Sequence, residues 1–170
     1  MKKIFIGRLL ICCGLALLCC SCKEKCKIEK PKNLKPIDWE NYNDVYTVFW
    51  NCKRDCSDES IMNDMGRNIK VFGWIFHGQT LDNPREFALI SNEEDIFWYN
   101  FCTRGVGIYV KTSYHNKDLL DSLKAKFATS DMTKKCYVSG MLSFDEWGGN
   151  ECCNTEPEIW LCSIDDIYFE

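Results

Sequence analysis

The chain has 170 residues, a formal net charge of −4 and an aromatic content of 14 %. This length suits one domain with a real hydrophobic core, and the aromatic content excludes an intrinsically disordered chain. We therefore expect a single folded domain.

Residues 1–21 have the composition of an export signal. Basic residues stand near the start, and the apolar stretch at 9–18 is too short to span a bilayer as a permanent helix. The stretch CCSC ends at Cys22, behind the small Ser21, and charged residues follow at once. This arrangement resembles the signal of bacterial lipoproteins, in which a cysteine after a small residue is lipidated and becomes the new N-terminus. The resemblance implies an acyl anchor at Cys22, with Cys20 as the rival, and a periplasmic or surface-exposed location in the cell envelope.

Residues 22–37 form a lysine-rich tether that has almost nothing apolar to bury. Such a segment should stay extended and hydrated, and beside a lipid anchor its charge would favour an anionic membrane surface. The export signal at residues 1–21 contains two lysines, one arginine and no acidic residue. Its removal therefore changes the formal net charge from −4 to −7. The remaining residues, 38–170, are expected to form the one domain.

Eight cysteines remain in the mature chain besides the acylated one. An even number in an exported domain permits disulfides, although sequence alone does not give their pairing. Cys52 and Cys56 are the local candidates for a bond. Cys136 and Cys162 should lie near opposite ends of two paired strands, so we do not expect them to be bonded.

Aromatic residues recur at helical spacing within 38–53, and Asp38 can cap the start of a helix there. The stripe consists of Trp39, Tyr42, Tyr46, Phe49 and Trp50. A stripe of this kind is more often core than ligand platform, so we expect a helix packed on the outside of a sheet. A polar loop should begin at Cys52, and another helical turn can form within 57–67.

From residue 69 the pattern changes to strands. Strands are predicted at 69–76, 86–91 and 106–112, because each segment is short, apolar and rich in β-branched or aromatic residues. A loop dense in turn residues is predicted at 77–84. The apolar run at 96–102 is either a continuation of the second strand or an irregular link.

A helix is predicted at 117–128, with Asn116 as its N-cap. Leu120, Leu123 and Phe127 fall on one face of this helix and should face the core. Strands at 136–144 and 158–169 follow, and a long loop is predicted between them at 145–157.

The order of three strands, a helix and two strands resembles the OB-fold, a five-stranded Greek-key barrel with a helix between strands 3 and 4. Glycines within the first and fourth strands, Gly73 and Gly140, add to the resemblance, which covers residues 69–170. The nearest relatives it implies are OB-fold lipoproteins of bacterial envelopes, most of them uncharacterised. A two-sheet sandwich is the structural rival.

The first strand carries two sets of side chains, because residues alternate between the faces of a strand. Val71, Gly73 and Ile75 suit a barrel interior. Phe72, Trp74 and Phe76 would then point outward, and three aromatics are too much apolar area to leave in water. We predict that the helix at 38–53 covers them, and the rival is that they form an exposed ligand platform.

Nucleic acid is the usual partner of OB-folds, which bind it through a basic groove and stacking aromatics. Residues 145–170 hold eight acidic residues and no lysine or arginine, and this segment supplies one wall of the usual site. Phosphate would be repelled there, which argues against a nucleic-acid partner.

The sequence predicts neither a metal site nor a cofactor. No cysteine pair has the spacing of a zinc ribbon, and the acidic loop lacks the spacing of a calcium hand. No nucleophile elbow or glycine-rich phosphate loop is found, so no catalytic residue is assigned. Of the two histidines, His77 lies where the first strand meets its loop, where a Cys–His pair would allow hydrolysis, and His115 is expected at the surface.

The sequence therefore predicts a non-catalytic binding module that is held at the membrane and recognises a protein or glycan of the envelope. The candidate ligand-facing residues are Trp98, Tyr99 and His77. Two alternatives stay open: a hydrolase that uses the His77 loop, and a structural subunit of an envelope complex.

Overall fold

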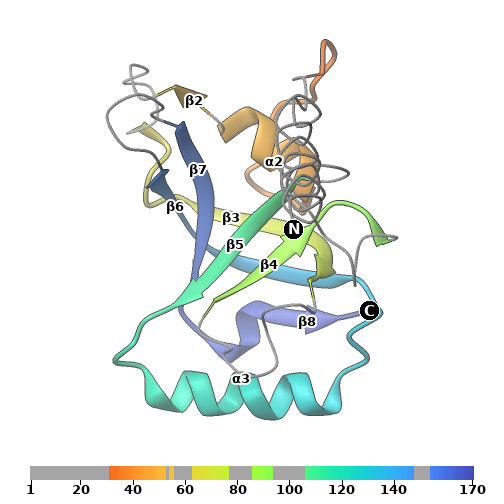
Figure 1. Cartoon of the computed structure of the whole chain (residues 1–170), viewed down its shortest axis with the longest axis vertical. Coiled ribbons are helices and arrows are strands. Elements are labelled where there is room, and N and C mark those ends of the chain that lie inside the picture. The colour runs from red at the N-terminus through yellow and green to blue at the C-terminus, as the bar shows by residue number, and fades with distance from the viewer. Residues whose placement is uncertain (1–30, 53, 56–62, 77–85, 94–105, 148–153) are drawn as a thin grey trace, which may run out of the picture.

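The computed structural model describes residues 31–52, 54–55, 63–76, 86–93, 106–147 and 154–170 (Figure 1). In chain order the elements are β1 (Asn43–Asp44), α2 (Val45–Cys52), β2 (Arg54–Asp55), β3 (Asn68–Ile75), β4 (Glu86–Ile90), β5 (Gly107–Thr112), α3 (Lys117–Thr129), β6 (Cys136–Trp147), β7 (Asn154–Leu161), the 3-10 turn η3 (Ile164–Asp166) and β8 (Ile167–Phe169).

Five of the strands close into a barrel in the order β3–β4–β5–β7–β6, and β6 returns to pair with β3. All of these pairings are antiparallel except the parallel pairing of β5 with β7. Helix α3 stands between the third and fourth barrel strands. This is the OB-fold, as the order of elements predicted, and the short strands β1, β2 and β8 extend it at β3, β7 and β6 respectively.

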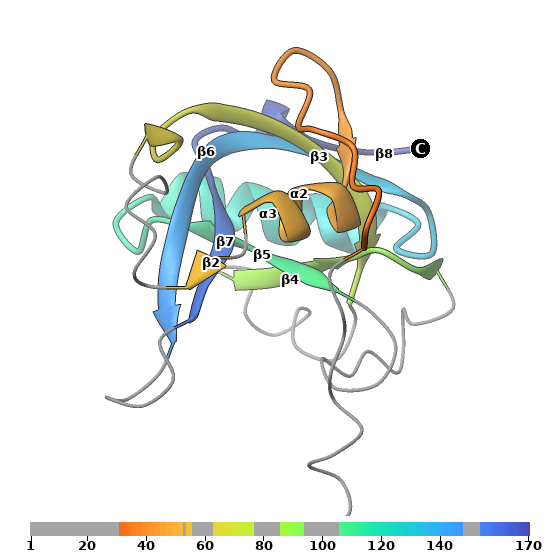
Figure 2. The same cartoon turned by 90° about the horizontal axis from the view of Figure 1, so that it is seen from above.

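A helix closes each end of the barrel (Figures 1 and 2). Along α3, Leu119, Leu123 and Phe127 are buried, and the Phe127 ring lies 5.3 Å from the ring of Phe87 on β4. The side chain of Asn116 accepts a hydrogen bond from the backbone N–H of Leu119 at 3.1 Å, which confirms the predicted cap.

Helix α2 flanks the opposite end, and Figure 2 shows it inside the outline of the strands. Its buried side chains, which include Val45, Val48 and Phe49, belong to the same hydrophobic core as the inner faces of the strands. The interior of the barrel is thus filled by side chains from the wall and from both helices.

Two glycines allow close approach at the wall. A Cβ added to Gly73 would lie 2.6 Å from the carbonyl oxygen of Ile90 and 2.7 Å from Cγ2 of Val45. A Cβ added to Gly140 would lie 2.5 Å from the carbonyl oxygen of Trp160 and 2.7 Å from Cγ2 of Ile159. At these two positions β3 and β6 approach their neighbouring strands so closely that only glycine fits. This agrees with the bend predicted from the two glycines.

Several predicted boundaries were wrong. The strand predicted at 158–169 is two strands, β7 and β8, separated by η3, and the loop predicted at 145–157 is shortened because β6 extends to Trp147 and β7 begins at Asn154. The helix predicted at 38–53 begins only at Val45. Most of the turn predicted at 57–67, and the run at 96–102, lie outside the described residues. No helix in the described part of the chain has the length and apolarity to cross a membrane.

Candidate ligand-binding surface

The prediction that the N-terminal helix covers the outer aromatics of the first strand was wrong. Val45 of α2 approaches Gly73, which belongs to the inward-facing set of β3, so α2 closes the end of the barrel instead. Phe72 and Trp74 stay on the outer wall, where both are half-buried. Phe76 follows the end of β3 and is also half-buried. The rival interpretation, a ligand platform, is the one that this geometry permits.

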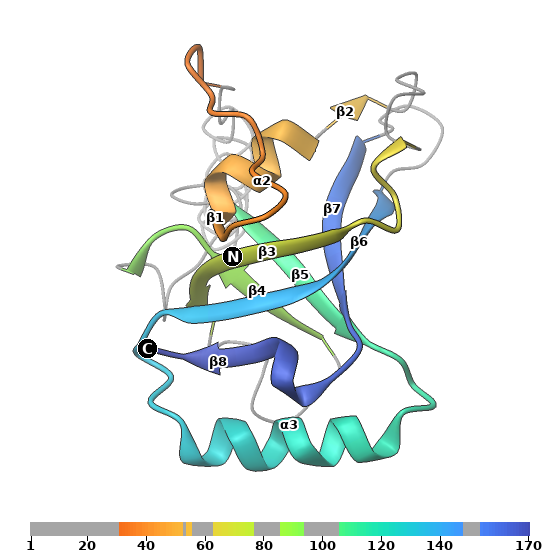
Figure 3. The same cartoon turned by 180° about the vertical axis from the view of Figure 1, so that it is seen from behind.

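Aromatic rings form a row across three neighbouring strands. Phe72 on β3 lies opposite Tyr137 on β6, and Tyr137 lies opposite Tyr168 on β8. The ring centroids of Phe72 and Tyr137 are 5.7 Å apart, and Tyr137 and Tyr168 are stacked at 4.7 Å with 3° between their planes. Figure 3 shows the three strands side by side on this face. Cross-strand aromatic pairs stabilise a sheet, and here they also give its outer face one continuous apolar strip.

Tyr42, just before β1, packs edge-on against this row. Its ring lies 5.2 Å from the ring of Tyr137 and 6.0 Å from that of Tyr168, nearly perpendicular to both. Burial, and then the neighbouring Tyr168, raise the pKa of the Tyr42 phenol. We call Tyr42, Phe72, Trp74, Tyr137 and Tyr168 the aromatic surface.

A lysine lies over one edge of the aromatic surface. The ammonium of Lys135 is 5.2 Å from the ring centroid of Phe72 and 5.3 Å from that of Trp74, within the range of cation–π attraction. At the other end Tyr168 leaves 43 % of its area in water. The surface thus offers aromatic rings, phenol hydroxyls and one positive charge to a ligand.

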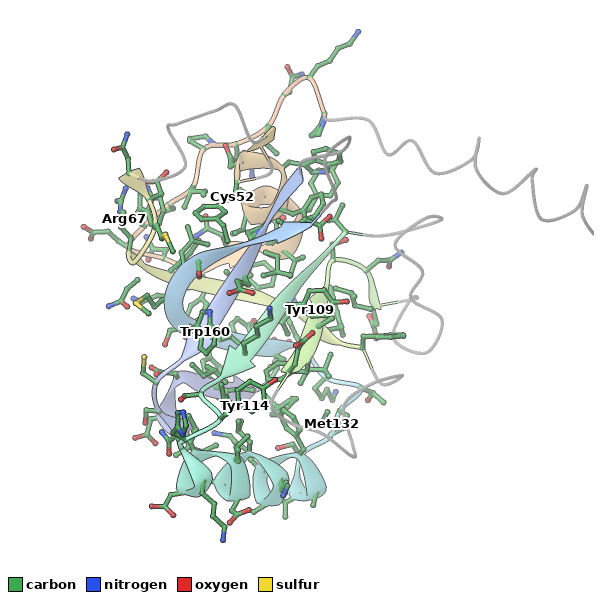
Figure 4. All side chains as sticks on the ribbon, turned by 60° about the vertical axis from the view of Figure 1, so that its left-hand side comes forward. Cys52, Arg67, Tyr109, Tyr114, Met132 and Trp160 are labelled. Atoms are coloured by element: carbon green, nitrogen blue, oxygen red, sulfur yellow. The ribbon has the colours of Figure 1, made fainter. Side chains whose placement is uncertain are left out.

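A second set of outward side chains lies on β5 and β7, the side of the barrel where Figure 4 labels Tyr109 and Trp160. Glu158 is buried there, accepts a hydrogen bond from the indole N–H of Trp160 at 2.7 Å, and pairs with the ammonium of Lys111 at 2.5 Å. Burial, followed by the charges of Glu86 and Glu156, raises the pKa of the Tyr109 phenol. These residues hold one another in place on the wall.

OB-folds commonly bind ligands on the face of their second and third strands, here β4 and β5. Ala88 and Ile90 occupy the outer face of β4 and are 1 % and 0 % exposed. The β4 part of the usual face is therefore closed to solvent, and its β5 part carries the half-buried Tyr109 and Lys111. The aromatic surface on β3, β6 and β8 includes Tyr168, which is the more exposed ring. The aromatic surface is the better candidate for a binding site.

Most of the candidate site residues predicted from the sequence lie outside the described part of the chain. Cys22, His77, Trp98 and Tyr99 all lie outside the described residues, as does Cys56. His115 is exposed before α3, as expected. Cys136 is buried at the start of β6, Cys162 is exposed beyond the end of β7, and both are free thiols.

Sequence reasoning missed Tyr137, Tyr168 and Lys135 as surface residues. Alternation along the strand could have identified Tyr137. Its neighbour Val138 is an inward residue, so Tyr137 must point outward. Tyr168 could not be placed while 158–169 was treated as one strand. Within the described part of the chain, no group of histidine, cysteine or acidic side chains could hold a metal ion.

Neither the family models nor the curated proteins gave a match to this chain. Among solved structures, the SSB of Plasmodium falciparum in complex with ssDNA is 18 % identical with a TM-score of 0.38, over 61 % of this chain and 93 % of that one. A small single-stranded DNA-binding protein from Streptomyces coelicolor is 11 % identical with a TM-score of 0.38, over 62 % and 94 %. An OBody bound to hen egg-white lysozyme is 20 % identical with a TM-score of 0.35, over 63 % and 82 %.

These matches contradict the expectation that nucleic acid is disfavoured as a partner, because one is bound to ssDNA and another is described as DNA-binding. That expectation considered the acidic segment at 145–170, whereas single strands are also bound by stacking on aromatic rings. We therefore withdraw it. A likeness at these TM-scores concerns the general architecture and assigns no ligand to this chain.

Proposed function

We propose that this protein is a non-catalytic binding module, held at the bacterial envelope by a lipid anchor, whose aromatic surface recognises a protein or glycan. The observation that carries the proposal is the set of aromatic rings left on the outer wall of β3, β6 and β8. Contiguous apolar patches of this kind mark interaction sites on soluble domains. Tyrosine and tryptophan suit such sites, because each offers a large apolar body and a polar group.

The packing of the barrel supports an outer-wall site. Core side chains from α2, α3 and the strands occupy the interior, which favours the outer wall as the place where a ligand binds. Sugars and peptides both stack on exposed aromatic rings, and the hydroxyls of Tyr137 and Tyr168 can hydrogen-bond with either. Truncation of one central aromatic residue at an interface typically costs about 2 kcal/mol or more, which is more than tenfold in affinity.

The binding experiment uses the full chain in detergent with three probes: soluble peptidoglycan fragments, an envelope protein extract and a single-stranded oligothymidine. The variants Tyr137→Ala and Tyr168→Ala should each lose affinity for the true ligand class by more than tenfold. Tyr114→Ala is the matched control, because Tyr114 is 70 % exposed and is not part of the aromatic surface. Equal binding by the Tyr137, Tyr168 and Tyr114 variants would exclude the aromatic surface. Selective binding of the oligothymidine would make the partner a nucleic acid.

The anchor is tested separately. Cys22→Ser should release the protein from the membrane fraction and abolish acyl labelling, since the lipoprotein resemblance assigns the acylated cysteine to that position. Unchanged fractionation would move the anchor to Cys20. His77→Ala should leave ligand binding unaltered, and loss of a hydrolytic activity in that variant would instead support an enzyme.

A further inference from the structure

The segment that precedes α2 packs along the outside of the barrel. We call residues 34–44 the N-terminal strap. Its apolar side chains Leu34, Ile37 and Trp39 are half-buried against the core, and its last two residues pair in parallel with β3 as β1. Figure 3 shows this segment descending past α2 to lie beside β3. The strap is therefore a layer on the outside of the closed barrel.

A single buried amide near the C-terminal end of the strap holds its middle in place. Asn43 is 7 % exposed, and its Nδ2 donates to the carbonyl oxygens of Asp38 at 2.7 Å, Asn41 at 3.1 Å and Lys70 at 3.3 Å. Its Oδ1 accepts from the backbone N–H of Asp38 at 2.9 Å. The bonds to Asp38 and Asn41 fold the strap on itself, and the bond to Lys70 ties that fold to β3.

Two exposed cations fasten it further. The guanidinium of Arg67 lies 3.5 Å from the ring centroid of Trp39, and the ammonium of Lys70 donates to the carbonyl oxygen of Glu40 at 2.9 Å. Arg67 also pairs with Asp64 at 2.8 Å, and the two side chains are 46 % and 41 % exposed. Exposed contacts of this kind contribute little each, so docking of the strap depends mainly on Asn43, on the pairing of β1 with β3 and on the half-buried apolar side chains. A segment held on the outside of a closed barrel can open locally while the barrel stays folded.

The strap carries one member of the aromatic surface. Tyr42 lies between Asn41 and the buried Asn43, and its ring rests edge-on against both Tyr137 and Tyr168. The other four members belong to β3, β6 and β8 of the barrel sheet. The aromatic surface is therefore complete only while the strap is docked.

We propose that the N-terminal strap is a detachable part of the aromatic surface, and that its docking on β3 determines how far Tyr137 and Tyr168 are exposed. With the strap docked, Tyr42 braces the pair; with the strap released, the pair loses this ring and opens to solvent. A ligand that contacts Tyr42 favours docking, and docking favours that ligand by the same factor. This consequence for binding rests on the proposed function, whereas the docking itself can be tested without any ligand.

The test uses the full chain in detergent with two measurements. Hydrogen exchange of the peptide covering 37–44 reports strap docking, and nitration of Tyr137 and Tyr168 by tetranitromethane, mapped by mass, reports access to the pair. Arg67→Ala removes the contact with Trp39 and should raise both rates roughly two- to fivefold, the weight of one exposed cation–π contact. Asn43→Ala removes several hydrogen bonds and should raise both by roughly tenfold or more.

Asp64→Ala is the matched control, because it removes the ion pair with Arg67 while leaving the guanidinium over Trp39. It should leave both rates unaltered. Exchange of the strap that rises without a rise in nitration would overturn the proposal, because the strap would then open without exposing the pair. No change in either rate in both the Arg67 and Asn43 variants would also overturn it. Since neither rate depends on a ligand, failure of the proposed function leaves this test intact.

Discussion

Gly73 lies in β3, close to both the neighbouring strand β4 and the helix α2 that closes one end of the barrel. A methyl group added at this position would collide with both. In Gly73→Ala the new Cβ would stand 2.6 Å from the carbonyl oxygen of Ile90 and 2.7 Å from Cγ2 of Val45. The Ile90 atom belongs to the backbone of the neighbouring strand, so one of the two strands must shift. Overpacking of a tight core costs about 1–3 kcal/mol. At about 3 °C per kcal/mol for a domain of this size, the expected fall in Tm is roughly 3–9 °C.

Thermal and urea unfolding of Gly73→Ala, Val45→Ala and the double variant measure this cost. Val45→Ala removes the helix side of the overlap and leaves the carbonyl of Ile90 in place. The double variant should therefore be more stable than the sum of the single losses predicts, by about 0.5–3 kcal/mol of coupling. A Gly73→Ala variant as stable as the parent, or strictly additive losses, would refute the close approach of α2 to β3.

Three further predictions concern single side chains. Lys111→Met leaves the buried carboxylate of Glu158 without its cation and should cost about 3–5 kcal/mol in urea unfolding, more than Glu158→Gln, which keeps an acceptor for the indole of its neighbour; equal losses would contradict this. Burial raises the pKa of the Cys136 thiol, so at neutral pH maleimide should modify the exposed Cys162 in the folded protein and reach Cys136 only on unfolding, as peptide mapping will reveal. Asn116→Ala should lower the unfolding free energy by about 1 kcal/mol through loss of the α3 cap, and an unaltered value would mean that the cap bond contributes nothing.

Local signals were sufficient for most of the barrel. The helix after Asn116 was predictable because a cap, an apolar face and a defined end all agree there. The first strand was predictable down to its two faces, since Val71, Gly73 and Ile75 alternate with larger aromatics. These elements could be predicted because the local preferences of their residues agree with the fold that they adopt.

The candidate site was harder to predict from the sequence, because its residues come from distant segments that only the fold brings together. Tyr42 is part of the aromatic stripe in sequence but lies before the helix, held by the pairing of β1 with β3. Periodicity cannot reveal a parallel pairing between distant segments. The break before β8 did carry a local signal, because Ser163 is followed three residues later by Asp166, the spacing of a capping box, and the structure shows their reciprocal bonds at the start of η3.

The parallel pairing of β5 with β7 has a consequence for how the chain is made. Tyr109 and its partner Glu158 are 49 residues apart, and no other described strand occupies that edge of β5. Synthesis at about 5–20 residues per second delivers β7 roughly 2–10 s after β5. Until then the nascent chain carries an unpaired strand edge beside a wall of aromatic rings, a combination that invites aggregation. The barrel should therefore close only after β7 has been synthesised, and until then the chain is a natural client for a holding chaperone.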